Sequence, residues 1–169
     1  MHTVRDAARD QRREYRQGDD RPLGSYGALL AVYGLTVGAT ALIARLTGRR
    51  PPELSLRDVA LMAVTTHRVS RILAKDAVTS PIRAPFTRYQ GVSGPAELSE
   101  EVRGSGARHA VGELLTCPFC LSQWAGTAYA AGMVFAPRAT RFVGATFTAM
   151  AAADWLHLAY TRLQRSAED

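Results

Sequence analysis

The sequence predicts an all-α membrane protein, a helical bundle of about four spans behind a charged N-terminal tail. Three observations predict this. Charged residues fall in blocks, with long uncharged runs between them. Four helix-length segments, the second of them amphipathic, approach the roughly 20 residues that a helix needs to cross a bilayer; they are residues 24–44, 56–75, 116–136 and 142–161. Basic residues are unequally shared between the loops that would lie on the two sides.

The tail, residues 1–23, alternates arginine with aspartate and glutamate. It lacks the apolar core and the small-residue cleavage site of a secretory signal, so we expect it to be retained. Although the net charge is +6, acidic residues are interspersed among the arginines, and no basic face carries interleaved aromatic residues. The sequence therefore argues against nucleic acid as a partner.

The first predicted span, residues 24–44, reaches about 30 Å as a helix, which is enough to cross a hydrocarbon core. Gly34 and Gly38 are four residues apart, a spacing that lets two helices approach closely in lipid. Two interpretations remain open for them. They either form the contact of a homo- or hetero-oligomer, or they reflect chance spacing in a segment rich in Ala and Gly.

The second segment, residues 56–75, predicts either a partial span or an interfacial amphipathic helix. Arg68 and Arg71 follow its uncharged stretch, and arginine within a bilayer is costly without a partner. The connector that comes next, residues 76–113, is rich in glycine and proline, and we assign it no regular fold.

Four spans would place 15 of the 21 Arg and Lys residues on the side that holds both termini and the connector. By the positive-inside rule, that side is the cytoplasm. We therefore predict a multi-pass protein of the inner or plasma membrane, with a helical membrane domain at residues 24–162 and a short tail at residues 163–169. If the second segment does not cross, this charge bias disappears.

The same topology places Arg71 and Asp154 at one depth. Each lies 13 residues beyond the start of its span, at Asp58 and Arg141 respectively, or about 20 Å down. Because a buried arginine and a buried aspartate stabilise each other, we predict an intramembrane Arg71–Asp154 ion pair, with Arg68 as the alternative donor. The alternative is a solvated Asp154 beside a short fourth helix.

Cys117 and Cys120 form a Cys-x-x-Cys motif at the predicted start of the third span, where Pro118 suits the first turn of a helix. A cytoplasmic position argues against a structural disulfide. Three interpretations remain: a redox-active thiol pair, half of a zinc site that His157 helps to complete, or packing at a helix start with Thr116 or Cys117 as the N-cap. One such motif does not decide among them.

Further motifs accompany the cysteines: the helix with Arg68 and Arg71, the Pro81–Phe86 segment around Arg83, and the run from Gly112 to Cys120 followed by Trp124. Together they resemble an uncharacterised bacterial integral membrane family, domain of unknown function 1360, which includes small sporulation-associated membrane proteins. The resemblance covers roughly residues 56–157. It implies an integral membrane protein with no assigned reaction, and its pattern singles out Arg68, Arg71, Arg83, Cys117, Cys120 and Trp124.

Two classes of function follow. The first is a non-enzymatic integral membrane protein, a scaffold or accessory protein of the bacterial envelope whose main partner is the lipid bilayer. The second is a thiol- or metal-dependent membrane protein that works through Cys117 and Cys120, with His157 as a further candidate ligand. The sequence favours the first class, because it has no Ser/His/Asp constellation, no phosphate-binding glycine loop and no paired carboxylates within a span.

Overall fold

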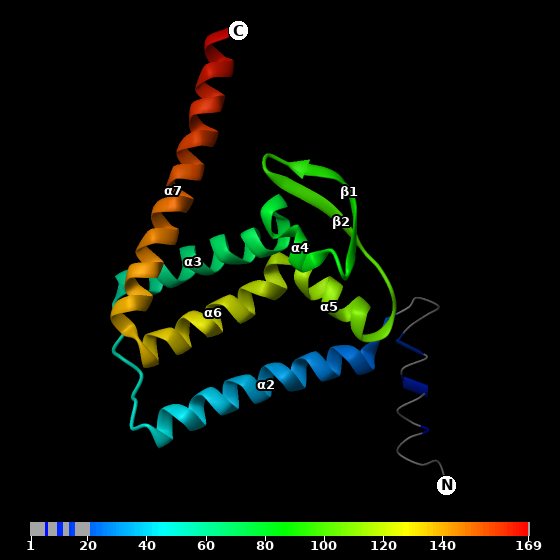
Figure 1. The fold of residues 1–169 in the computed structure, drawn as a ribbon. Helices are drawn as coiled ribbons and strands as arrows, with labels where there is room; N and C mark the ends of the chain where they lie inside the picture. The colour runs from blue at the N-terminus through cyan, green and yellow to red at the C-terminus, as the bar shows by residue number, and fades with distance from the viewer. Residues whose placement is uncertain (1–5, 7–9, 12–13, 16–20, 169) are drawn as a thin grey trace.

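The computed structural model describes residues 6, 10–11, 14–15 and 21–168, so most of the predicted tail lies outside the described residues. Long helices dominate the fold (Figure 1): α2 (Leu23–Leu46), α3 (Leu56–Lys75), α6 (Pro118–Phe135) and α7 (Pro137–Glu168). The shorter elements are η1 (Ala77–Thr79), α4 (Ser80–Arg83), β1 (Thr87–Gly94), β2 (Glu97–Val102) and α5 (Gly106–Thr116).

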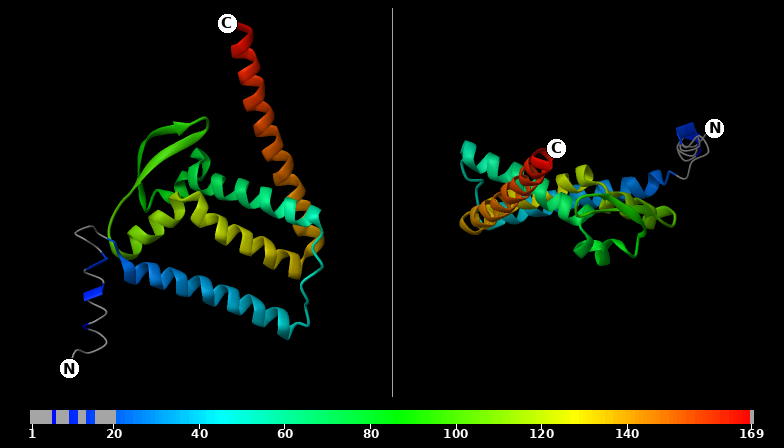
Figure 2. Two further views of the ribbon diagram at one scale, coloured as in Figure 1. Left: turned by 180° about the vertical axis from the view of Figure 1, so that it is seen from behind. Right: turned by 90° about the horizontal axis from the view of Figure 1, so that it is seen from above.

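Helix α6 lies between α2 and α3, and the three helices run side by side (Figures 1 and 2). Helix α7 starts at one end of this layer, crosses α3 and then projects away from the body to the C-terminus. The β-hairpin lies at the other end, over α5 and the end of α3. A small core of apolar side chains joins the layers: Leu61, Ala74, Ala110, Leu121, Tyr129, Met133 and Ala151.

The prediction of an all-α bundle with four spans is wrong. Within the part of the chain that the structure describes, α2 is the single helix long and apolar enough to cross a membrane. The other three fall short because polar residues interrupt them. Arg68, Arg71 and Lys75 lie along the second half of α3, Ser122 and Gln123 lie early in α6, and Asp154 and His157 lie within α7. The predicted multi-pass topology loses its support for the same reason.

The connector to which we assigned no fold contains the sheet. Strands β1 and β2 pair antiparallel, from Thr87 opposite Val102 to Gly94 opposite Glu97. The register shifts twice, and the first shift lies beside Gly91, whose φ of 141° is accessible to glycine but rarely to other residues. The glycines that resembled loop breakers therefore shape a bulged hairpin.

Helix α3 begins with a capping box that also fixes α7. The Ser55 hydroxyl accepts a hydrogen bond from the Asp58 backbone N–H (3.2 Å), and the Asp58 carboxylate accepts one from the Ser55 N–H (3.1 Å). Arg141, near the start of α7, donates two more hydrogen bonds to this carboxylate at 2.8 and 3.2 Å. This cluster therefore sets where α3 and α7 cross.

We expect the Asp58 cluster to make stability depend on pH. The Arg141 guanidinium, followed by Ser55, holds the pKa of the Asp58 carboxyl well below its usual range. A carboxyl with a depressed folded-state pKa stabilises the fold above its unfolded pKa of about 4, and this contribution fades as the pH falls towards the folded value. Asp58→Asn should thus lower the thermal midpoint at neutral pH, and the gap from wild type should begin to narrow below about pH 4 and shrink further as the pH falls.

Glu53→Gln is the matched control for this experiment, because it removes one carboxylate on an exposed side chain close to Asp58. Its midpoint should follow that of the wild type at every pH. Thermal unfolding followed by circular dichroism measures all three proteins. A gap between Asp58→Asn and wild type that stays constant from neutral pH to about pH 3 would contradict the assignment.

Candidate functional site: the cleft between α3, α7 and the hairpin

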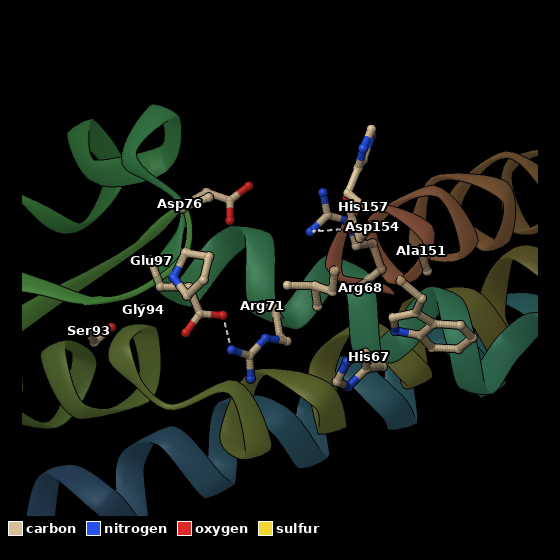
Figure 3. Close-up of a pocket in the computed structure, with 14 residues that line it drawn as sticks. His67, Arg68, Arg71, Asp76, Ser93, Gly94, Glu97, Ala151, Asp154 and His157 are labelled. Atoms are coloured by element: carbon tan, nitrogen blue, oxygen red, sulfur yellow. Dashed lines mark hydrogen bonds and ion pairs between the residues drawn. The ribbon is translucent and has the colours of Figure 1, made fainter. Parts of the chain in front are cut away.

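A cleft of about 650 Å³ lies where α3, the hairpin turn and α7 meet (Figure 3). Because η1 and α4 turn the chain back after α3, the hairpin turn and the middle of α7 both lie beside the second half of α3. Most of the charged or titratable side chains that line the cleft come from α3 and α7: His67, Arg68, Arg71, Asp154 and His157. Asp76, directly after α3, and Glu97 of β2 complete the set.

Two ion pairs cross this cleft. Arg68 of α3 lies 3.1 Å from Asp154 of α7 (Nη1 to Oδ2), and Arg71 pairs with Glu97 at the start of β2. Asp154 is thus paired with the alternative donor that we named, while Arg71 is bound to the hairpin instead. Since neither α3 nor α7 is apolar enough to cross a membrane, and 43% of the Asp154 side chain is exposed, the pair lies at a cleft mouth.

In contrast to the partly exposed Asp154, Arg83 has a fully buried side chain. Its Nε and Nη2 donate to Glu100 at 2.6 and 3.2 Å, while Nη1 donates to the Leu73 carbonyl (2.8 Å) and to the Thr79 hydroxyl (2.6 Å). Nη2 also reaches the Asp76 carbonyl at 2.9 Å. All five donors of the guanidinium are therefore used. Arg83 joins β2 to the end of α3 and is a structural residue.

The thiols lie at the start of α6. Of the two N-cap candidates, Thr116 and Cys117, the structure has Cys117. Its Sγ accepts a hydrogen bond from the Cys120 backbone N–H at 3.2 Å, and both cysteines are free. Burial, followed by the neighbouring Cys117, raises the pKa of the Cys120 thiol to about 11. A redox-active thiol needs the opposite shift, so Cys120 remains protonated at neutral pH.

The structure does not bring His157 to the cysteines. His157 lines the cleft beside Asp154, whereas both cysteines belong to α6. Over residues 21–168 and the few described in the tail, no three His, Cys, Asp or Glu side chains gather closely enough to hold a metal ion. The residues present therefore do not fit the zinc site considered from sequence.

The remaining predicted residues belong to α2 and α6. Trp124 packs edge-on against Tyr33 with ring centroids 5.2 Å apart, and the Tyr33 hydroxyl is hydrogen-bonded to Thr127 (2.8 Å). Gly34 and Gly38 face open space, because a Cβ added at either would have no neighbour within 4 Å. An oligomer contact through these glycines stays a prediction.

The family profile described as "Protein of unknown function (DUF1360)" matches residues 61–160, which is more than half of the chain. The chain belongs to the DUF1360 family. The region shared with DUF1360 runs from α3 into α7 and includes both cysteines, the hairpin and the cleft arginines. Helix α2 lies outside it.

A curated relative of this DUF1360 chain is the sporulation protein YjcA of Bacillus subtilis (strain 168). The two are 29% identical over 69 residues, which are 39% of this chain and 58% of that protein. The chain thus matches little more than half of its relative's length. No solved structure matches this DUF1360 protein.

Proposed function

We propose that this protein is a non-enzymatic scaffold or accessory protein of the bacterial envelope, attached to the membrane by α2. The observation that carries the proposal is the surface of α2. This helix has no charged residue between Gly24 and Ala44, and none of its 24 residues is buried. Leu30 and Leu35 near its middle are 71% and 72% exposed.

Energetics favour lipid around such a helix. Leaving one large aliphatic side chain in water, instead of burying it, forgoes about 1.5–3 kcal/mol. Helix α2 exposes six of them by half or more: Leu30, Val32, Leu35, Leu42, Ile43 and Leu46. Their summed cost is on the order of the 5–15 kcal/mol that stabilises a whole domain. A bilayer removes this cost, and the arginines before and after the helix can reach its headgroups.

The polar clusters of the body support a structural rather than a catalytic role. Arg83 joins β2 to the end of α3, and the Asp58–Arg141 pair joins α3 to α7. Cys117 caps a helix, and Cys120 is a protonated thiol. The DUF1360 description assigns no reaction, and the sporulation process named for the relative is a property of that protein.

Membrane fractionation of the full chain tests the attachment. We expect the wild type to stay with the membranes after an alkaline carbonate wash. Val32→Asp/Leu35→Asp should be released, because each aspartate near the middle of a span adds about 3 kcal/mol to the cost of insertion. Leu156→Asp/Leu163→Asp is the matched control, with the same two charges on exposed leucines of α7.

The control variant should remain attached like the wild type. Attachment through α2 would be refuted if the carbonate wash released the wild-type protein. It would also be refuted if Val32→Asp/Leu35→Asp stayed with the membranes as fully as the control variant.

A further inference from the structure

Arg68 and Arg71 leave most of their hydrogen-bonding capacity unused. Arg68 makes its one ion pair through Nη1, and its Nε is buried with no acceptor within the described structure. Arg71 likewise reaches its carboxylate through a single nitrogen. In contrast, Arg83, which comes just before the hairpin in the sequence, uses all five of its donors. A buried guanidinium N–H without an acceptor is costly, which calls for an explanation.

We propose that this cleft binds the phosphate group of an amphipathic molecule, with Arg68 and Arg71 as the residues that bind it. A phosphate offers several acceptors to a guanidinium, and arginine binds such groups through two parallel hydrogen bonds. Binding lets Arg68 turn out of its present position and find acceptors for the donors that now lack them. The proposal does not depend on α2 lying in a membrane.

The carboxylate of Asp154 is the group that the phosphate displaces. Its pair with Arg68 is a single contact, and the aspartate is 43% exposed, so it can return to water easily. Exposed ion pairs of this kind contribute little stability. Displacement is required, because Asp154 occupies Nη1 of Arg68. The cleft also holds three carboxylates, Asp76, Glu97 and Asp154, against its two arginines. His67 and His157 add positive charge only when protonated.

The apolar side of the cleft indicates what the phosphate is attached to. Ala151, Trp155 and Leu158 of α7 line it opposite the hairpin, whose turn adds Pro95 and Ala96. Its volume of about 650 Å³ is within the range of roughly 300–1,000 Å³ that accepts a whole small molecule. A phosphate with a short apolar body, as in a phospholipid headgroup region, fits this lining.

A fluorescence titration of the full chain tests the proposal. The protein has two tryptophans, so Trp124→Phe leaves Trp155, which lines the cleft, as the reporter. In a neutral detergent, dioctanoyl phosphatidic acid should change the Trp155 emission saturably. Dioctanoylglycerol, which has the same chains without the phosphate, should not. Inorganic phosphate is the third titrant.

Four substitutions in the same background distinguish specific binding by the cleft arginines from a general effect of charge. Arg68→Gln and Arg71→Gln should each weaken binding of the phosphatidic acid about ten-fold or more. Arg138→Gln, an exposed arginine of α7 outside the cleft, removes the same charge and should leave binding unchanged. Asp154→Asn should tighten binding several-fold, because it releases Arg68; if Asp154 only positioned Arg68, binding would weaken instead.

Each outcome is decisive. Inorganic phosphate that binds as tightly as phosphatidic acid would support the phosphate site and identify a free phosphate, rather than a lipid headgroup, as its ligand. The proposal is overturned by an equal response to dioctanoylglycerol, by equal effects of the Arg68, Arg71 and Arg138 variants, or by no saturable response to either phosphate. Weaker binding by Asp154→Asn would overturn the displacement step.

Discussion

Arg83→Met is expected to lower the free energy of unfolding by about 3–5 kcal/mol, the cost of removing one partner of a buried ion pair. Methionine fills part of the volume but leaves Glu100, whose side chain is 6% exposed, as a buried carboxylate without its guanidinium. The Leu73 and Asp76 carbonyls lose their donors as well. Urea unfolding followed by circular dichroism measures the loss, and hydrogen exchange should show that β2 is released from α3.

The double variant Arg83→Met/Glu100→Leu distinguishes an unpaired charge from lost packing. Replacing both members of a buried pair by apolar residues is often close to neutral, so the double variant should be more stable than Arg83→Met. Arg83→Lys retains the charge but offers three donors in place of five, so an intermediate loss is expected. The ion-pair argument fails if the double variant is no more stable than Arg83→Met.

The four long helices of this protein could be predicted from local sequence, because their signals are local; α5, most of which lies in the connector, was missed. Helix α3 has the predicted bounds, Leu56–Lys75, and α6 begins at Pro118 directly after its cysteine cap. Apolar runs, prolines and caps mark helices and their ends wherever the helix lies. They do not tell whether the helix faces lipid, water or a neighbour, which is why four similar segments suggested four spans.

The hairpin had no comparable signal. Strand β2 reads Glu-Leu-Ser-Glu-Glu-Val, and β1 contains Gly91 and Gly94, so neither shows the clean apolar alternation of a half-buried strand. Its stability comes from pairing and from Arg83, a residue outside both strands. A segment held by a side chain outside its own strands resembles a loop when its sequence is read alone.

The residues of the candidate site divide in the same way, into those with a local sequence signal and those without one. Arg68, Arg71 and Asp154 were found because charges in an otherwise apolar helix are unusual. Glu97 was missed, since a partner in a segment without an assigned fold cannot be placed against α3. The role of Asp58 did have a local signal, because Ser55-Leu56-Arg57-Asp58 is a capping-box spacing.

The second large effect is expected at Gly112, a buried residue of α5 beneath the hairpin. A Cβ at this position would lie 2.6 Å from Cγ1 of Val102 and 3.1 Å from the backbone carbonyl oxygen of Phe86. Gly112→Ala should therefore lower the free energy of unfolding by about 1–3 kcal/mol. Alanine's higher helix propensity, worth about 1 kcal/mol, acts in the opposite direction and does not offset a clash with backbone.

Gly126→Ala in α6 is the matched control, because its nearest neighbours are Thr66 side-chain atoms at 3.5 and 3.6 Å, an ordinary contact. With propensity alone acting, this control should be neutral or more stable by up to about 1 kcal/mol. Adding Val102→Ala to Gly112→Ala removes the closest contact and should recover part of the lost stability. The contact with the Phe86 carbonyl oxygen remains and should account for the rest of the loss. Equal unfolding midpoints in urea for the two glycine variants would mean that the hairpin does not pack on α5 as closely as these distances require.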